Sequence, residues 1–144
     1  MAEYVPSPIE WVREQVALIE RTNGAEGYSL PGTNMAVVVV TNTGNKTGNI
    51  RKTPLMRVKD GDSYILVGSM GGAPKNPVWV YNLRENPDVE LRDRDHVQPM
   101  RVREITDNTE YERLWEIAVA AFPNYAEYRQ KTTRRIPVFR AEPA

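Results

Sequence analysis

Residues 41–54, TNTGNKTGNIRKTP, combine the residue types that hold anions in proteins. Three cations, Lys46, Arg51 and Lys52, lie within seven residues of one another, and two glycines interrupt the segment. Glycine allows backbone N–H groups to approach a phosphate closely, while lysine and arginine add charge and hydrogen-bond donors. The segment predicts an anion cradle, with a hairpin loop carrying solvated basic residues as the alternative. The glycine patterns of a Walker loop and of the dinucleotide fingerprint are both absent.

A second glycine-rich segment, SMGGAP at residues 69–74, follows a predicted strand. Asn76 is expected to cap the helix that comes next, with Pro77 at its first position. Backbone donors near a helix N-terminus suit an anionic ligand. The alternative is a tight connection in which small residues are needed only for packing.

Several chemistries are not expected from this composition. The chain has no cysteine, which excludes disulfides, thiolate metal sites and cysteine nucleophiles. Its single histidine, His96, ends the polar run RDRDH, which is typical of a solvated hairpin tip. We therefore expect neither a metal site nor a Ser-His-Asp triad.

The length of 144 residues suits one domain, residues 1–144, and 40% hydrophobic with 26% charged residues indicates a globular chain. A formal net charge of +0 argues against nucleic acid as the main partner. No apolar stretch reaches the roughly 18 residues that span a bilayer, and no signal peptide is visible. A cytoplasmic location is the expectation.

The N-terminal region predicts a helix over about residues 7–21. It opens with SPIE, a capping box with proline at the first helical position. Ile9, Val12, Val16 and Ile19 form a narrow apolar stripe. Packing across a sheet or barrel mouth is one interpretation of this helix, and peripheral membrane contact with Trp11 as an interfacial anchor is the other.

The remaining pattern predicts short strands and few helices. Strands are expected at residues 36–41, 53–59, 63–69, 89–91, 97–105 and 136–139, and further helices at 78–85, 108–121 and 125–131. Asp60 and Gly61 form a hairpin signal, and Pro137 favours an edge strand or a strand beginning. Mostly antiparallel strands with few helices indicate an α+β, mainly β fold: a small closed or split β-barrel with flanking helices.

These residues together resemble a known family, the deazaflavin-dependent nitroreductases of the flavin/deazaflavin oxidoreductase superfamily. The resemblance runs from about residue 35 to residue 143. It is carried by TGNKTG at 43–48, RKTPL at 51–55, GGAPKNPVW at 71–79, NL at 82–83, NP at 86–87, FPNY at 122–125, Tyr128 and IPVF at 136–139. It implies a split β-barrel of the FMN-binding kind and reduced coenzyme F420, a deazaflavin with a phosphate and polyglutamate tail, as the cofactor.

The resemblance also implies roles for individual residues. The phosphate and tail would be held by Lys46, Thr47, Arg51 and Lys52. The deazaflavin ring would lie beside Pro54, Leu55 and Met56 on one side and beside Ser69, Gly71, Gly72 and Ala73 on the other. The acceptor would meet an aromatic wall of Trp79, Tyr125 and Tyr128. The chain departs from its relatives at Asn45 and Met70, where relatives often carry arginine and lysine.

The implied reaction is hydride transfer to an electron-poor acceptor: a quinone, a nitroaromatic or an activated C=C such as an unsaturated lactone. Because the cofactor brings its own reactivity, the protein supplies orientation and electrostatics. Ser69, Tyr125 or Tyr128 would hydrogen-bond the acceptor oxygen. An FMN- or haem-binding protein on the same barrel and a non-catalytic carrier remain alternatives. We expect a monomer or weak homodimer.

Overall fold

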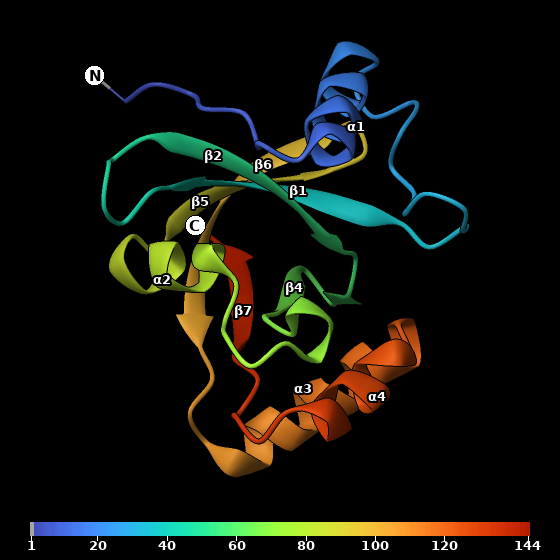
Figure 1. Cartoon of the computed structure of the whole chain (residues 1–144), viewed down its shortest axis with the longest axis vertical. Coiled ribbons are helices and arrows are strands. Elements are labelled where there is room, and N and C mark those ends of the chain that lie inside the picture. Colours follow the sequence, from blue (N-terminus) through green and yellow to red (C-terminus); the bar gives the residue numbers. More distant parts are fainter. Residues whose placement is uncertain (1) are drawn as a thin grey trace.

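The computed structural model describes residues 2–144 and shows a strongly curled sheet with helices on its outside (Figure 1). Seven strands are hydrogen-bonded in the order β2-β1-β5-β6-β7-β4-β3, and every pair is antiparallel. They are β1 Val37–Thr43, β2 Ile50–Met56, β3 Lys59–Asp60, β4 Ser63–Val67, β5 Asp88–Asp93, β6 His96–Glu104 and β7 Val138–Pro143. The predicted α+β, mainly β split barrel is confirmed.

Helices cover this half-barrel on different sides. They are α1 Glu10–Arg21, α2 Val78–Glu85, α3 Asn108–Ala121 and α4 Asn124–Lys131, with a 3-10 turn, η1, over Met70–Gly72. In Figure 1, α1 lies against β1 and β2, whereas α3 and α4 lie at the opposite end of the molecule, past β4 and β7. Within residues 2–144, no helix is both long and apolar enough to cross a membrane.

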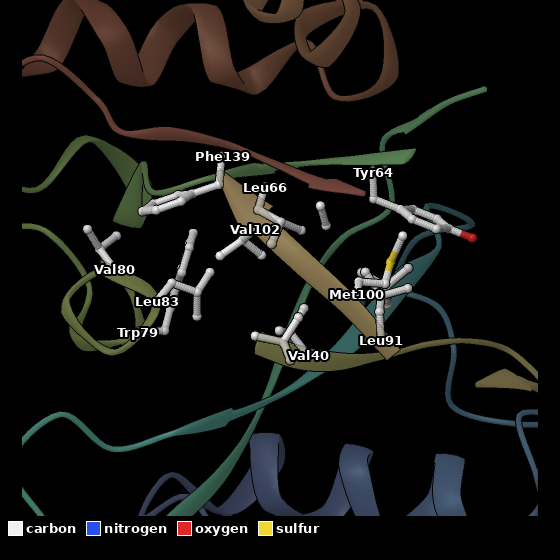
Figure 2. Packing of buried hydrophobic residues seen from close by; sticks show 13 residues of the cluster. Val40, Tyr64, Leu66, Trp79, Val80, Leu83, Leu91, Met100, Val102 and Phe139 are labelled. Atoms are coloured by element: carbon white, nitrogen blue, oxygen red, sulfur yellow. The ribbon is translucent and has the colours of Figure 1, made fainter. Parts of the chain in front are cut away.

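Four consecutive valines explain the central position of β1. Val38 and Val40 point into the barrel core, while Val37 and Val39 pack with Val16 and Ile19 of α1. Side chains alternate between the two faces of a strand, so both faces of β1 are buried. Figure 2 shows the core, in which side chains from several strands meet and Trp79, Val80 and Leu83 of α2 close one end.

One predicted helix start and two predicted helix caps are wrong. The first helix begins at Glu10, because Ser7 accepts a hydrogen bond from the Ile9 N–H at 3.2 Å and Ile9 itself is extended. No side chain caps this helix. The next helix, α2, spans Val78–Glu85 as predicted, but Pro77 rather than Asn76 is at the cap position, and the Asn76 amide oxygen accepts from Arg134 at 2.8 Å.

Strand boundaries also differ from the prediction. β2 begins at Ile50, opposite Thr43, so the basic loop shrinks to residues 44–49 and its last two cations, Arg51 and Lys52, lie on a strand. β2 is an edge strand, which is where its Pro54 can be tolerated. The edge interpretation of the last strand is wrong, because β7 lies between β6 and β4; Pro137 precedes its first residue, as the other interpretation predicted.

The predicted hairpin turn at Asp60 and Gly61 and the predicted exposed hairpin tip at His96 are confirmed. The turn between β3 and β4 contains Gly61 with a φ of +65°, and Asp107 caps α3 by accepting from the Glu110 N–H at 2.8 Å. His96 is exposed at the β5–β6 hairpin. The helix after Pro123 places Tyr125 and Tyr128 one turn apart.

Candidate functional site

One cleft runs between the β1–β2 loop and α4, and it has two parts. The polar hollow, about 800 Å³, is lined by Gly44, Asn45, Lys46, Thr47, Arg51, Thr53, Val78, Trp79, Tyr81 and Asn82. The apolar hollow, about 590 Å³, lies between α1, β2, the turn at η1 and α4. Arg51, Thr53 and Trp79 line both hollows, so the two lie side by side.

The polar hollow presents cations without carboxylate partners. Lys46 is exposed and Arg51 is half-buried, and neither forms an ion pair with any of residues 2–144. The loop is tight: the Gly48 N–H donates to the Gly44 carbonyl, and a Cβ on Gly44 would lie 2.9 Å from the Thr47 Oγ1. The two cations are therefore available to an anionic ligand.

Buried amides hold this loop in place. The Asn82 Oδ1 accepts from the Asn45 N–H, and the Asn82 Nδ2 donates to the Asn42 Oδ1, both at 2.9 Å. Asn42 in turn donates to the Val40 carbonyl and to the Thr53 hydroxyl. Sequence reasoning gave neither asparagine a role. The available signal was Asn42, a polar residue within a run of β-branched strand residues.

The apolar hollow is walled by aromatic rings. Phe122 and Tyr125 meet edge to face, with ring centroids 5.0 Å apart, and the Tyr125 and Tyr128 centroids are 6.3 Å apart. Tyr125 is almost fully buried, and that burial, with a smaller contribution from Tyr128, raises its pKa above the ordinary value. The Tyr125 hydroxyl thus stays protonated and can donate a hydrogen bond.

The loop after β4, residues 69–76 and here called the glycine loop, has an unusual backbone. Ser69 is right-handed helical, and the next three residues, Met70, Gly71 and Gly72, all have positive φ of 48°, 66° and 83°. A Cβ on Gly72 would lie 2.8 Å from the carbonyl oxygen of Tyr128. Only glycine therefore lets α4 and its tyrosines pack this closely on the loop.

Most of the predicted site residues meet in this cleft. Lys46, Thr47 and Arg51 line the polar hollow, and Arg51, Lys52, Pro54, Leu55, Met56, Ser69, Gly71, Trp79, Tyr125 and Tyr128 line the apolar one. Three predicted cofactor-binding residues make close contacts with other parts of the protein. Gly72 is buried against α4, and the Ala73 carbonyl accepts from Arg134. Lys52 forms an ion pair with Glu20 and lies over the Tyr4 ring.

Sequence reasoning missed the contribution of α1 to this cleft. Trp11, Val12 and Gln15 of α1, together with Ser7 and Ile9 just before it, line the apolar hollow. Ile9 and Trp11 remain 54% and 52% exposed, which places them at its rim. The interpretation of this helix as cover for a barrel mouth agrees with its position.

Among residues 2–144, no group of three or more histidine, cysteine, aspartate or glutamate side chains is arranged to hold a metal.

Comparison with known proteins gives consistent matches over most of the chain. A sequence model described as F420H(2)-dependent quinone reductase matches residues 11–143. An F420H(2)-dependent quinone reductase of Mycobacterium tuberculosis strain H37Rv is 37% identical over 136 residues, covering 90% of this chain and 88% of the relative. A solved structure of an F420-H2 dependent reductase, FDR-A, is 44% identical with a TM-score of 0.69, covering 77% of this chain and 100% of that one. A domain-swapped dimer is 43% identical with a TM-score of 0.73, covering 94% and 100% of the two chains.

Proposed function

The chain belongs to the F420H(2)-dependent quinone reductase family, and from this premise we propose that it reduces a quinone with a hydride from reduced coenzyme F420. One observation supports this assignment above the others. A hollow with two cations that have no ion-pair partner among residues 2–144 lies next to an apolar hollow with a tyrosine wall, and the two share three lining residues. A ligand with a charged tail and a flat ring system needs both environments in this order.

The residues of the polar hollow fit the anionic part of this coenzyme. Lys46 and Arg51 are free to form charge-assisted hydrogen bonds with phosphate, and Thr47 lies between them in the chain. The ring system would lie beside Pro54, Leu55 and Met56 of β2, facing Ser69 and Gly71, all of which line the apolar hollow. When bound, the reduced coenzyme supplies a hydride.

The acceptor site is proposed to be the aromatic side of the apolar hollow. Trp79, Tyr125 and Tyr128 offer flat apolar surfaces to a planar acceptor. When the acceptor gains a hydride, one negative charge appears on its oxygen until one proton is added. Tyr128 is half-buried and lines the hollow, so its hydroxyl, or that of Ser69 or Tyr125, can donate to this oxygen. Solvent then replaces the proton.

The acceptor class can be tested directly with the purified protein. We expect reduced coenzyme F420 to bind and to be oxidised at a rate that depends on quinone concentration. Nitroaromatics and unsaturated lactones are the other acceptors to include, since an apolar slot with hydrogen-bond donors also admits them. Turnover with these compounds but with no quinone would contradict the proposal. Copurification with bound FMN or haem, or binding of the coenzyme without turnover of any acceptor, would favour the alternative functions.

The surroundings of the enzyme are also proposals. Because Ile9 and Trp11 are exposed at the mouth of the apolar hollow, we propose that α1 touches a membrane surface from which a lipid-soluble quinone can enter. We propose a cytoplasmic location at that surface and a monomer or weak homodimer. Flotation with lipid vesicles, compared with a variant carrying Ser at both positions, tests the contact. Equal flotation of the two proteins would exclude it.

A further inference from the structure

Arg134 makes four hydrogen bonds to the glycine loop and its flanks. Its Nε donates to the Ala73 carbonyl at 2.9 Å, and its Nη2 donates to the Ser69 carbonyl at 2.7 Å. Its Nη1 donates to the Gly68 carbonyl at 3.2 Å and to the Asn76 Oδ1 at 2.8 Å. One planar guanidinium therefore links both ends of the loop, which the flexible point charge of lysine cannot do.

The charge of Arg134 is not neutralised locally. All four of its partners are neutral, and no carboxylate pairs with it within residues 2–144. Most other arginines that contact side chains do pair with acids, namely Arg57, Arg84, Arg101, Arg103, Arg113, Arg129 and Arg140. Partial burial lowers the pKa of Arg134 from its usual value, yet arginine stays protonated at any physiological pH. A lasting positive charge thus lies directly behind the loop.

This charge is coupled to backbone donors that line the cleft. The Ser69 carbonyl that receives the Arg134 Nη2 belongs to the same peptide unit as the Met70 N–H, and the Gly68 carbonyl to that of the Ser69 N–H. Ser69 is right-handed and Met70 left-handed, an arrangement that turns successive N–H groups toward one side. The N–H groups of Ser69, Met70 and Gly71 find no acceptor among residues 2–144, and all three residues line the apolar hollow.

We propose that Arg134 is a positioning residue for hydride transfer: it fixes the N–H groups of the glycine loop toward the acceptor and places an uncompensated positive charge behind them. The inference rests on the proposed function. Hydride addition delivers two electrons and one proton to the quinone, and one quinone oxygen carries negative charge until a proton from solvent or a tyrosine completes the hydroquinone. Donors that are already oriented, polarised by a cation, stabilise that oxygen without reorganising.

The test compares Arg134→Gln and Arg134→Lys with Arg135→Gln. Arg135 is the neighbouring exposed arginine, which donates to Asn108 and lies over the Tyr111 ring, so its loss changes the net charge equally but leaves the loop alone. We expect kcat with a quinone to fall about 10–100-fold in Arg134→Gln, by analogy with the loss of an oxyanion donor, with Kd for the reduced coenzyme changing by less than about 3-fold. The Arg135 variant should keep parental kcat.

A second readout needs no coenzyme. Calorimetry measures the affinity of each protein for a hydroxynaphthoquinone, which is anionic at neutral pH, and for an uncharged methylnaphthoquinone of similar size. The preference for the anion should fall by at least about 10-fold in Arg134→Gln and remain in Arg134→Lys, which keeps the charge. Equal loss of both affinities would mean that Arg134 only holds the fold, and would overturn the proposal.

The two hypotheses can fail separately. Absence of turnover by the parental protein would overturn the proposed function, whereas the affinity ratio judges Arg134 on its own. If a thermal melt shows that Arg134→Gln does not fold, Arg134→Lys decides. It cannot reach all four acceptors, so kcat should fall at least about 3-fold with Kd for the coenzyme unchanged. Parental kcat in that variant would contradict the inference.

Discussion

The two ends of the cleft place their positive charges in opposite ways. At the polar hollow, Lys46 and Arg51 face the cleft, and the neutral pair Asn42 and Asn82 holds the loop from behind. At the apolar hollow, Arg134 lies behind the glycine loop, and the N–H groups of Ser69, Met70 and Gly71, which line this hollow, have no acceptor among residues 2–144. The same scaffold thus uses amides to support cations at one end and a cation to support amides at the other.

This difference follows from the charge that each end has to meet. A phosphate is permanently charged and hydrated, so flexible cations can pair with it as it arrives. The charge on a reduced acceptor exists only during the reaction, and oriented dipoles meet such a charge at lower cost than groups that must move. The groups without a partner in the free protein therefore differ between the two ends. Cations are unpaired where the ligand is already anionic, and backbone N–H groups are unpaired where the acceptor becomes anionic during the reaction.

The largest expected effect concerns the tyrosine wall. Tyr128→Phe removes only a hydroxyl and keeps the ring that packs against Phe122. If this hydroxyl donates to the acceptor oxygen, turnover should fall on the order of 10–1000-fold, by analogy with the loss of an oxyanion donor. Affinity for the coenzyme should change little, as measured by titration. Tyr125→Phe tests the more buried hydroxyl in the same way.

The matched control for the wall is Tyr28→Phe, because Tyr28 is half-buried outside the cleft, beside Arg94. Its turnover should equal that of the parent, and melting temperatures of all three variants identify any loss of stability. Parental turnover of both Tyr125→Phe and Tyr128→Phe on every acceptor would show that the two rings only pack.

The second effect concerns the opposite end. Arg51→Ala should weaken coenzyme binding by about 1.5–3 kcal/mol, the usual contribution of a charge-assisted hydrogen bond, and the loss should shrink at high salt. Lys52→Ala is the comparison, since Lys52 is one residue away but is already paired with Glu20. We expect its effect to be smaller, because an anion must compete with that carboxylate. Isothermal titration at two salt concentrations measures both, and equal losses would assign Lys52 the same role as Arg51.

The Arg51 and Lys52 pair also marks the limit of what the sequence could predict. Their charge and their place after four valines indicated a strand leading to a cationic segment, and both residues line the cleft. Composition could not indicate that the pairing of Thr43 with Ile50 moves both cations onto a strand. Nor could it reveal the partner of Lys52, because Glu20 lies 32 residues away in α1.

Residues that support the site were the hardest to predict. Glycines in a loop indicate directly where the backbone takes conformations that other residues avoid. The glycine loop was therefore recognisable from its residues alone. In the sequence, nothing distinguishes Arg134 from the arginine next to it, because its hydrogen-bond partners lie 58 to 66 residues earlier in the chain. Hydrogen-bonding capacity is local, whereas the choice of partner depends on how β4, α4 and the segment before β7 come together. Similarly, cover of a barrel mouth was one of two interpretations of the first helix, but its contribution to the apolar hollow was not predicted.

A third prediction tests the amide support of the polar hollow. Asn82→Ala removes the acceptor of the Asn45 N–H and leaves the buried Asn42 Oδ1 without its donor. An unpaired buried polar group costs about 1–3 kcal/mol, so the free energy of unfolding should fall by that amount in chemical denaturation. Coenzyme affinity should also fall, because the basic loop at residues 44–49 loses the hydrogen bond that anchors it.

The double variant of Asn42 and Asn82 to Ala sharpens this test. Because the two side chains share one network, the loss of stability in the double variant should be less than the sum of the two single losses. Additive losses would mean that the amides act independently, and unchanged coenzyme affinity would separate the network from the function of the loop.

The smallest expected effect lies outside the cleft, where charges are paired in the ordinary way. The Asp60 carboxylate accepts from Arg140 at 2.7 Å and lies 3.6 Å from Arg113. The hydrogen bond from Arg140 is the main reason that the pKa of Asp60 lies below its usual value of 3.8. A depressed pKa contributes stability above the unfolded-state pKa and loses it as pH falls through the lower, folded-state value. Arg140→Gln should therefore reduce the free energy of unfolding by about 1 kcal/mol or less at neutral pH, as partly exposed pairs do, and the difference should narrow as the pH falls below 3.8 and Asp60 becomes protonated. Urea unfolding at neutral pH and at about pH 3 measures this, while quinone turnover should equal that of the parent. A loss of turnover without a loss of stability would show that this distant pair influences the cleft. The contrast between the two ends of the cleft would then be incomplete, because a third charged region would also contribute.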